Sequence, residues 1–460
     1  MKAALFSGNK SGSGKTVITT AIAAYLAKNA AVQTFKTATD YIDASYLSGV
    51  TKRPCFNLDS FIQSEDELRA LFAYGCRDAD FGIVEGVRGL YEGESALSDA
   101  GSTAAAAKLL KLPVILIVDA GSITRSAAAL VLGFQQFDPD VEIAGVILNN
   151  IGHGKHAEKA KDAIEHYCKI PVLGAIPKNP GLSLPSRHLG LVPYSEATGK
   201  DLFSEDMEQI TEYIVSHLDM GRIVEIFRDI PAGSPALLCP DSQVFEELTH
   251  PVPLNRRIAV AYDEAFYFYY GELDAVFASF GCEIIRFSPI RDELPEADGY
   301  FFGGGYPELF AESLSRNKKM RDAVKTAADS GIPVYAECGG LLYLMDTLVT
   351  EAGFHDIAAS AVYEFCGVFS GTAVIPDKKV LGYAEADAEL NGKHFALKGH
   401  EFHYSGTALL KEYEFSFTLS RGQGISSGKD GVRYKNVLAS YTHLMPVSAR
   451  AFFKEFFCWE

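Results

Sequence analysis

Two groups of residues, far apart in the sequence, have the types and spacing that chemistry requires. The first is a glycine-rich loop over residues 8–16 that lies between an expected strand and an expected helix. Backbone N–H groups of such a loop hold phosphates, its lysine supplies positive charge, and its threonine hydroxyl reaches Mg²⁺. The residues expected to bind ATP are Gly12, Gly14, Lys15 and Thr16. Asn9 replaces the first glycine of the strict pattern, and a turn that only caps a helix is the alternative.

Carboxylates follow two further strands that we expect near this loop. Asp40 and Asp43 come after the second strand, and Glu85 ends the third. Phosphoryl transfer needs carboxylates that hold Mg²⁺, and open α/β sheets bind ligands at the carboxyl ends of their strands. Asp40 and Asp43 also suit the start of a helix, so position alone leaves both readings open.

The second group surrounds Cys338, which lies in Ala-Glu-Cys-Gly-Gly between an expected strand and an expected helix. We expect the thiol to be exposed at the helix N-terminus, where the helix dipole favours a thiolate. Backbone N–H groups of Gly339 and of Gly305, in a second glycine loop, would stabilise an oxyanion. A buried inert thiol is the alternative.

A thiol nucleophile needs a base, and His443 is the best candidate in the sequence. His400 and His403 compete with it, and a hydrogen-bonded core histidine is the alternative for each. Glu401 between these two histidines suggests a metal site, but no third ligand follows at a suitable spacing. A carbonyl-attacking thiolate and an ATP site in one chain are typical of a glutamine-dependent amide synthetase.

The bulk composition limits the partners and the compartment. The chain has 460 residues, 42 Lys and Arg against 59 Asp and Glu, and a net charge of −17, which argues against nucleic acid or an anionic membrane as a partner. The eight cysteines are scattered without paired metal spacing, as in a reducing cytosol. Apolar runs are strand-length, and the N-terminus runs directly into a strand, so we expect a cytoplasmic protein.

The elements that must position these residues form two α/β domains. Apolar strands alternate with helices over residues 1–228, which predicts a parallel sheet covered on both faces. Residues 229–256 are rich in proline and predict a linker. A second alternating domain follows over 257–460, with helices expected at 266–280 and from 341. Its later part, over 362–370, 379–384 and 413–419, is expected to be richer in β-structure and less regular.

Together these motifs resemble the cobyrinate a,c-diamide synthase family, including its archaeal members that act on nickel-sirohydrochlorin. The resemblance covers nearly the whole chain and includes the glycine-rich loop and residues 40–43, 53–59, 83–93, 101–103, 125–129, 187–193, 263–266, 303–308, 336–340, 399–405 and 441–444. It implies a dethiobiotin-synthetase-like P-loop domain followed by a class I glutamine amidotransferase domain. It also implies ATP- and Mg²⁺-dependent formation of an acyl phosphate on the a and c acetate groups of a tetrapyrrole, displaced by ammonia from glutamine.

The resemblance assigns roles to the residues named above. It implies Cys338 and His443 as catalytic residues, and Thr16, Asp40 and Glu85 as the metal ligands. The residues that it implies for substrate or intermediate are Lys36, Asp43, Arg88, Glu92 and Arg125. The partners expected are glutamine, ATP and the tetrapyrrole, and a homodimer stays open.

Three positions depart from the family pattern. Residues 37–39 read Thr-Ala-Thr where the family commonly has Val-Gly-Pro, and Glu92 replaces an aspartate. His443 is followed by Leu and Met445, where a carboxylate two residues on would complete a triad, so no orienting acid is evident.

The sequence leaves three other functions open. A cobyric acid synthase-like amidase of other corrinoid carboxylates shares both domains. A partitioning-type ATPase switch is suggested by Lys10, five residues before Lys15, but leaves Cys338 unexplained. A glutaminase-like module with an inactive ATP domain conflicts with the intact Lys15 and Thr16. Residues 85–93, 123–126, 148–151 and 421–425 look archaeal, which predicts that cobyrinate and nickel-sirohydrochlorin are both substrates, with the nickel compound preferred.

Overall fold

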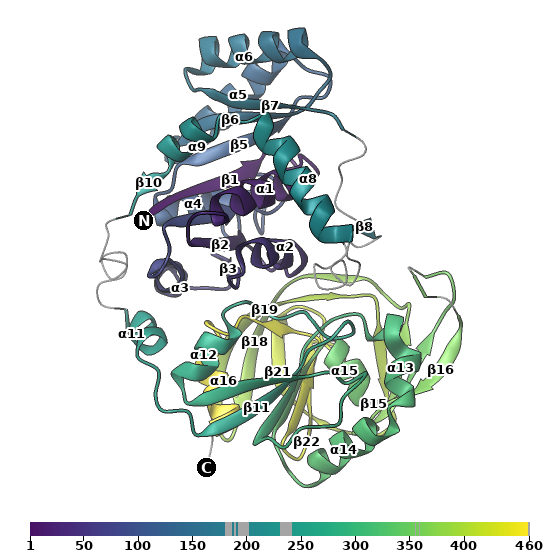
Figure 1. Cartoon of the computed structure of the whole chain (residues 1–460). Coiled ribbons are helices and arrows are strands. Elements are labelled where there is room, and N and C mark those ends of the chain that lie inside the picture. Colours follow the sequence, from purple (N-terminus) through teal and green to yellow (C-terminus); the bar gives the residue numbers. More distant parts are fainter. Residues whose placement is uncertain are drawn as a thin grey trace. The chain divides into compact units, whose positions relative to one another are not determined.

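The computed structural model describes residues 1–179, 186–187, 190–191, 202–230, 242–354, 356–357 and 359–458. The chain divides into two compact units, Met1–Glu246 and Glu247–Glu460 (Figure 1). Helix α11 (Gln243–Thr249) lies within the segment predicted as a linker. Residues 231–241 of that segment, and residues 188–189 and 192–193 of the motif at 187–193, lie outside the described residues.

A parallel sheet forms the centre of the first unit. Its strand order is β3-β2-β4-β1-β5-β6-β7, and β10 (Arg228–Asp229) pairs antiparallel with the start of β1. The strands are β1 (Lys2–Gly8), β2 (Val32–Thr37), β3 (Phe56–Leu58), β4 (Phe81–Glu85), β5 (Val114–Asp119), β6 (Ile143–Ile151) and β7 (Val172–Pro177). Most of their residues are buried, as expected of strands covered by helices on both faces. The parallel sheet predicted from the alternation of apolar strands and helices over residues 1–228 is present.

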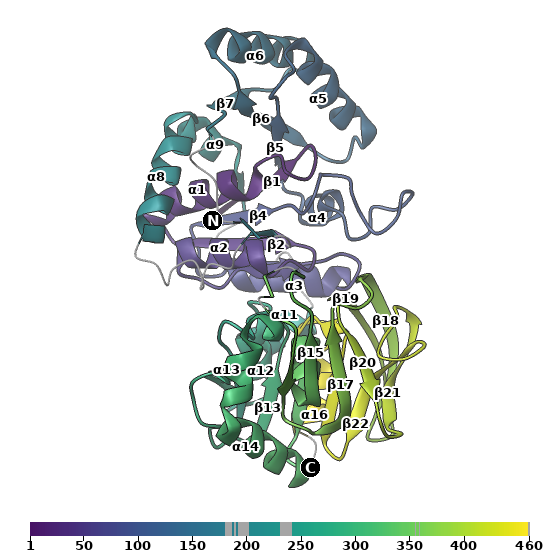
Figure 2. The ribbon, with the colours of Figure 1, turned by 90° about the vertical axis from the view of Figure 1, so that its right-hand side faces the viewer.

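Helices cover both faces of this sheet. Figure 2 shows α1 and α2 on one side and α4 on the other. The helices are α1 (Lys15–Ala27), α2 (Ile42–Thr51), α3 (Glu65–Cys76), α4 (Thr103–Leu110), α5 (Arg125–Phe137), α6 (Gly154–Cys168), α8 (Leu202–Ser216) and α9 (Met220–Ile226). A capping box begins α3, where Ser64 accepts from the Glu67 N–H and the Glu67 side chain returns to the Ser64 N–H.

The second unit contains a ten-stranded sheet that is parallel at one end and antiparallel at the other. Its order is β12-β11-β13-β14-β23-β22-β21-β18-β19-β24. The parallel strands are β11 (Arg256–Ala261), β12 (Cys282–Phe287), β13 (Gly299–Phe302), β14 (Val334–Glu337) and β23 (Val437–Ser440). The others are β18 (Val380–Leu390), β19 (Lys393–His403), β21 (Glu414–Arg421), β22 (Lys429–Tyr434) and β24 (His443–Leu444).

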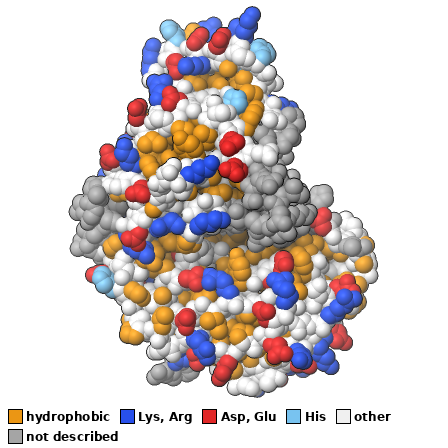
Figure 3. Space-filling view, viewed as in Figure 1, with side chains coloured by type: hydrophobic (Ala, Val, Ile, Leu, Met, Phe, Trp, Pro, Cys, Tyr) orange, Lys and Arg blue, Asp and Glu red, His pale blue; other side chains and the backbone are white. Residues whose placement is uncertain are grey.

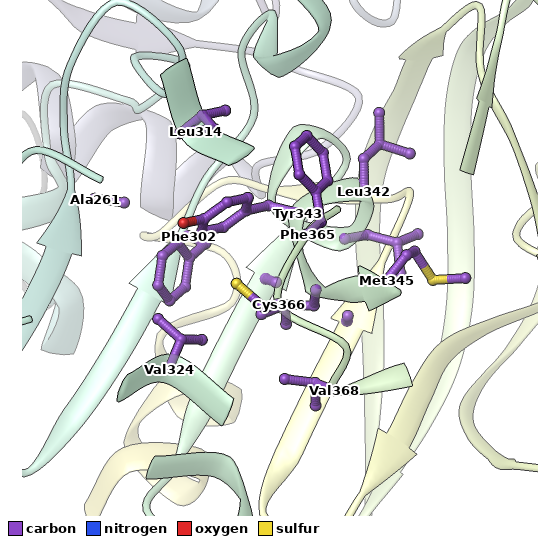
Figure 4. Close-up of a cluster of buried hydrophobic side chains, with 14 of the residues drawn as sticks. Ala261, Phe302, Leu314, Val324, Leu342, Tyr343, Met345, Phe365, Cys366 and Val368 are labelled. Atoms are coloured by element: carbon purple, nitrogen blue, oxygen red, sulfur yellow. The ribbon is translucent and has the colours of Figure 1, made fainter. Parts of the chain in front are cut away.

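Successive residues of β13 show how this sheet is covered. Phe301 packs against Phe277 of α12 (Leu273–Ser279) and Phe453 of α16 (Arg450–Cys458). Phe302 points to the other face, where its ring contacts Tyr343 of α15 (Gly339–Leu344) (Figure 4). The 3-10 turn η1 (Pro307–Phe310) and the helices α13 (Ala311–Arg316) and α14 (Lys318–Asp329) are also in this unit.

One predicted helix of the second unit begins later than expected, and one segment expected to be rich in β-structure contains two strands. The helix expected from residue 266 begins only at Leu273, because the N–H groups of Tyr267 and Phe268 bond instead to the Gly304 carbonyl. The β-rich segment expected at 362–370 contains β16 (Ala361–Glu364) and the start of β17 (Phe369–Ile375), which form a separate sheet with β15 (Met345–Thr350) and β20 (Gly406–Leu409).

The surface mixes charges of both signs. Basic and acidic side chains are interspersed on the face drawn in Figure 3. Within the part of the chain that the structure describes, no helix is long and apolar enough to cross a membrane.

Candidate active sites

The phosphate-binding loop joins β1 to α1. Gly12 and Gly14 have φ values of 74° and 91°, in the left-handed region that side chains rarely adopt. A Cβ at Gly14 would also lie 2.2 Å from Nδ2 of Asn149. Glycine is therefore required at position 14 for two reasons: the backbone has a positive φ, and a side chain would clash with Asn149. Lys15 follows as the first residue of α1 and is buried.

Asn9 and Lys10 are both held at the end of β5. The Asn9 side chain accepts a hydrogen bond from the Asp119 N–H, at 3.0 Å. Nζ of Lys10 lies 2.8 Å from Oδ2 of Asp119, with more than half of the lysine side chain exposed. In this structure Lys10 thus forms a partly exposed ion pair with Asp119.

A buried ammonium group lies among the carboxylates beside the loop. Nζ of Lys36 is 2.6 Å from Oε1 of Glu85 and 2.7 Å from Oδ2 of Asp43. The Thr16 hydroxyl donates to the same two oxygens, at 2.9 Å and 3.0 Å respectively. Strand register explains the proximity, because Lys36 on β2 is the direct partner of Glu85 on β4. We call Thr16, Lys36, Asp43 and Glu85 the Lys36 cluster.

Asp40 lies at the edge of this cluster. Its Oδ2 is 3.9 Å from Nζ of Lys36, and its Oδ1 accepts the Asp43 N–H at 2.9 Å. The Asp40 carboxylate thus accepts a backbone N–H from the first turn of α2 and also faces Lys36. The resemblance grouped Asp40 with Thr16 and Glu85, whereas the carboxylates that the Thr16 hydroxyl contacts are those of Asp43 and Glu85.

Burial and charge act against each other in the Lys36 cluster. Burial opposes ionisation of Lys36, but the carboxylates of Asp43 and Glu85 outweigh it and raise the pKa of the lysine. Burial and the Asp43 charge raise the pKa of Asp40 to about 7. Burial, followed by the charge of Lys36, lowers the pKa of Lys15. Burial opposes ionisation of Asp43, but the charge and hydrogen bond of Lys36 outweigh it and lower the pKa of that carboxyl. The site therefore favours an ammonium at Lys36 beside an ionised Asp43, with Asp40 more easily neutralised at its edge.

The donor set of this site suits Mg²⁺. The oxygens of Thr16, Asp43 and Glu85 are hard ligands, and Oε2 of Glu85 is buried without a hydrogen bond from any described residue. No three His, Cys, Asp or Glu side chains within the described residues form a ready-made metal site. Mg²⁺ usually takes only one or two protein carboxylates and completes its shell with phosphate oxygens and water. The residues thus fit a metal that arrives with ATP.

The remaining predicted substrate residues lie on exposed segments. Arg88 is exposed and has a φ of 49°, and Glu92 is exposed near Gly89. Arg125, at the start of α5, donates from Nη2 to the Tyr167 hydroxyl at 2.7 Å. The structure therefore places these three outside the contacts of the Lys36 cluster given above.

Asn149 is a site residue that the sequence reasoning missed. Its Nδ2 donates to the Ser13 carbonyl of the phosphate-binding loop, at 2.9 Å. The available signal was a pair of asparagines, Asn149 and Asn150, near the end of the apolar strand β6. Asn150 donates to Asp119, at 2.9 Å, so the pair ties the ends of β5 and β6 to the loop.

In the second unit, Cys338 forms the turn between β14 and α15. Its φ of 45° and ψ of −100° are strained for a residue with a side chain. A Cβ at Gly340 would lie 2.1 Å from the Phe302 carbonyl oxygen, so the chain can turn here only with glycine at that position. The thiol was predicted to be exposed, yet Cys338 is only 6% exposed. Strand β19 covers it, with the Phe402 carbonyl oxygen 3.8 Å from Sγ.

The strand next to the nucleophile delivers His443. Glu337 on β14 is in register with Ser440 on β23, and the Ser440 carbonyl accepts the Cys338 N–H at 2.7 Å. Buried Asp430 then fixes the following turn, because its carboxylate accepts the N–H groups of Tyr441 and Thr442 at 3.0 Å and 2.9 Å. His443 is thereby brought back to the cysteine.

The His443 ring is buried, and its neighbours favour its protonated form. Nδ1 lies 3.4 Å from Oε2 of Glu337, and the Cys338 thiol also hydrogen-bonds the ring. Burial opposes protonation, but these two contacts outweigh it and raise the pKa of His443 to about 10. His400 stacks on the ring with centroids 4.9 Å apart. The arrangement favours an imidazolium beside the Cys338 side chain.

The two glycines predicted for an oxyanion hole are neighbours. A Cβ at Gly339 would lie 3.1 Å from the Gly305 nitrogen, and one at Gly304 would lie 2.4 Å from Cε1 of His443. The Gly340 N–H bonds to the Gly303 carbonyl, at 3.0 Å, which holds this loop against the turn. The glycine loop, the cysteine and the histidine therefore converge.

The competing histidines have other positions. His403 stacks on Tyr441 with ring centroids 3.8 Å apart, and its Nδ1 faces the Ser405 carbonyl oxygen at 2.9 Å. Burial lowers the pKa of His403 to about 4 and lowers that of His400 well below its usual range. Both are therefore neutral near pH 7, which leaves His443 as the charged histidine beside Cys338.

Two protein families match the two units. Residues 5–192 match a family described as "CobQ/CobB/MinD/ParA nucleotide binding domain". Residues 257–451 match one described as "CobB/CobQ-like glutamine amidotransferase domain". These matches confirm the predicted fold class, a P-loop nucleotide-binding domain followed by a glutamine amidotransferase domain.

Full-length relatives are similar over nearly the whole chain. A "Cobyrinate a,c-diamide synthase" of Methanosarcina barkeri is 44% identical over 97% of this chain and 94% of its own length. Proteins with the same name from Methanobrevibacter smithii and Streptococcus sanguinis are each 38% identical, over 95% and 96% of this chain and 94% and 96% of their own lengths.

Proposed function

Because this chain belongs to the cobyrinate a,c-diamide synthase family, as its motifs predicted, we propose that it amidates the a and c acetate groups of a tetrapyrrole. Ammonia from glutamine and energy from ATP drive the reaction. The observation that carries the proposal is one chain with two sites, the phosphate-binding loop beside the Lys36 cluster and the Cys338–His443 pair.

The first unit activates the carboxylate. A substrate acetate oxygen attacks the γ-phosphorus of ATP, so that ADP leaves and an acyl phosphate forms. Lys15 and the loop N–H groups stabilise charge on the phosphates, and Lys36 is placed to stabilise the acyl phosphate. Thr16, with Asp43 and Glu85 or Asp40, would hold Mg²⁺, which neutralises phosphate charge when bound. Ammonia then attacks the acyl carbon, and phosphate leaves with the former carboxylate oxygen.

The second unit supplies ammonia. The Cys338 thiolate attacks the glutamine carboxamide carbon, and the N–H groups of Gly305 and Gly339 stabilise the oxyanion. His443 donates its proton to the leaving nitrogen, so ammonia departs and a thioester remains. Water, with His443 as the base, then releases glutamate. Burial of Cys338 and His443 keeps other nucleophiles away from the thioester.

The proposed substrates are cobyrinate and nickel-sirohydrochlorin, with the nickel compound preferred. Residues 85–93, 123–126, 148–151 and 421–425, which resemble archaeal members of the family, support the nickel compound. Exposed Arg88 and Arg125 are candidates to bind its carboxylates, because guanidinium groups bind carboxylates through paired hydrogen bonds.

The test is isotope transfer with each tetrapyrrole. Substrate carrying ¹⁸O in its carboxylates is incubated with ATP, Mg²⁺ and glutamine, and products are analysed by mass spectrometry. We expect two amides per macrocycle and one ¹⁸O in phosphate for each amide. Amides without ¹⁸O in phosphate contradict the acyl phosphate. If cobyrinate reacts and nickel-sirohydrochlorin does not, the archaeal preference is wrong. If neither reacts while glutamine is hydrolysed, the tetrapyrrole assignment is wrong.

A further inference from the structure

Glu337, the residue directly before the nucleophile, has a position that the sequence did not assign. The family resemblance left His443 without an orienting acid, because Met445 stands two residues after it. We propose that Glu337 is the positioning residue that orients His443 and stabilises its protonated form during glutamine hydrolysis. This inference rests on the proposed function, since it concerns the same ammonia-producing site.

The contacts of the Glu337 carboxylate fit that role. Oε2 lies 3.4 Å from Nδ1 of His443. Oε1 accepts the Leu444 N–H at 3.1 Å and the Tyr335 hydroxyl at 3.1 Å. One oxygen therefore holds the backbone just after the histidine, while the other faces its ring. Because Nδ1 lies against Glu337, Nε2 is the nitrogen left for the Cys338 thiol.

Burial strengthens the interaction between the Glu337 carboxylate and the His443 ring. The Glu337 side chain is 4% exposed and that of His443 is 1% exposed, so water screens the interaction little. A lone buried carboxylate or imidazolium would be costly, whereas the pair is compensated. The Leu444 N–H and Tyr335 hydroxyl complete the hydrogen bonds of the carboxylate. The geometry thus resembles the acid of a Ser-His-Asp triad, reached here from the nucleophile's own strand.

The other titratable groups that face His443 cannot replace Glu337. His400 stacks on the ring, and His403 lies on the same strand β19. Burial keeps both neutral near pH 7. The thiol of Cys338 is the reacting group itself. Asp430 holds the backbone of Tyr441 and Thr442 through its carboxylate oxygens.

The test compares Glu337→Gln with Glu337→Asp, using glutamine hydrolysis measured against pH. Loss of the charge should lower the glutaminase kcat on the order of 10²-fold, with a smaller change in the KM for glutamine. It should also lower the His443 pKa, so the alkaline limb of kcat/KM should move down by about 1 pH unit or more. Glu337→Asp retains the charge and should recover part of the rate and of the limb position.

Glu401→Gln is the matched control. Glu401 is a buried glutamate of the same unit, and its carboxylate accepts the N–H groups of Gln423 and Gly424 at 2.7 Å and 2.6 Å. Its neutralisation should leave the alkaline limb unmoved. Should Glu401→Gln shift that limb as far as Glu337→Gln does, the effect is one of general disruption and the proposal is overturned.

Two further outcomes would overturn the role of Glu337. One is a Glu337→Gln variant with wild-type rate and pH profile. The other is a Glu337→Asp variant no better than Glu337→Gln, including a case in which both fail to fold, because the side chain would then act through structure. A wild-type protein that hydrolyses no glutamine contradicts the proposed function itself, whereas an active wild type with an unchanged Glu337→Gln contradicts this inference alone.

Discussion

The two candidate sites occupy equivalent places in their sheets but are built in opposite ways. Each follows the carboxyl end of a parallel strand, β1 in the first unit and β14 in the second. In the first, the sharply turned positions are Gly12 and Gly14, and the reactive side chains lie on regular elements around them. In the second, the reactive residue Cys338 itself has the strained backbone, and glycines follow it.

This difference matches the chemistry proposed for each site. A phosphate is bound by many N–H groups and charges, so the first site needs an unobstructed backbone and a dense set of ionised groups. A nucleophile must present one atom in one direction, so the second site fixes the backbone of a single residue. The Lys36 cluster is held together mainly by electrostatic interactions. The cysteine site depends instead on the backbone geometry of Cys338 and on the buried pair of Glu337 and His443.

The largest expected effect separates the two sites by nitrogen source. Cys338→Ala should lower glutamine-dependent amidation by at least about 10³-fold while amidation with high ammonium persists, because free ammonia bypasses the thiolate. Lys15→Ala should abolish amidation with either source, because phosphate charge is no longer stabilised. Product formation with each source is the measurement. Ammonium-dependent activity in Lys15→Ala, or its loss in a folded Cys338→Ala, would contradict the division.

The next effect tests the charge density of the first site. Lys36→Met removes the buried cation and leaves Glu85 and Asp43 uncompensated, which should lower the free energy of unfolding by about 3–5 kcal/mol. Lys10→Met removes the partly exposed partner of Asp119 and should cost no more than about 1 kcal/mol. Chemical denaturation of both variants is the measurement. Equal losses would show that the Lys36 cluster is no more strongly coupled than a surface pair.

The pH dependence tests the ion pair of the second site. The pKa of His443 is raised to about 10 from its ordinary 6.5, so the stability it contributes is fully present below pH 6.5 and lost as pH rises through 10. Glutamine hydrolysis should therefore persist through pH 9 and fall about tenfold per pH unit above pH 10. A kcat/KM profile measures this. An alkaline limb near pH 7 would show that the imidazolium is not stabilised.

The smallest effect tests the backbone strain. Cys338→Gly should be more stable than Cys338→Ala by about 1 kcal/mol, because only glycine tolerates a φ of 45° with a ψ of −100°. This reverses the usual order, in which alanine is the more stable residue. Gly14→Ala should be destabilising for the same reason. Thermal unfolding of the three variants measures the effect, and a more stable Cys338→Ala would argue against strain at the turn.

Much of the first site could be predicted from the sequence. Glycine spacing, Lys15 and Thr16 identify a phosphate loop, and acidic residues at strand ends converge once the sheet is known to be parallel. The sequence could not show that Lys36 lies between Glu85 and Asp43, because that depends on the register of β2 with β4. Local patterns specify strand ends, whereas register comes from tertiary packing.

The second site was less predictable for two physical reasons. Glu337 meets His443 only because β23 lies beside β14 and its following turn is fixed by Asp430. The apolar run after residue 266 suits a helix, yet its N–H groups bond to Gly304, a partner distant in sequence. Exposure of Cys338 was overestimated because the covering strand β19 follows much later in the chain.

One measurement tests the central claim most directly, namely that this chain makes ammonia at Cys338 and uses it to amidate a tetrapyrrole activated by ATP. Wild-type protein is given cobyrinate or nickel-sirohydrochlorin in separate reactions, each with ATP, Mg²⁺ and glutamine labelled with ¹⁵N in its amide, and with unlabelled ammonium at a concentration that does not support the reaction alone. The account predicts a diamide in which both new nitrogens are ¹⁵N. Two unamidated tetrapyrroles alongside hydrolysed glutamine, or amides without the label, would contradict it.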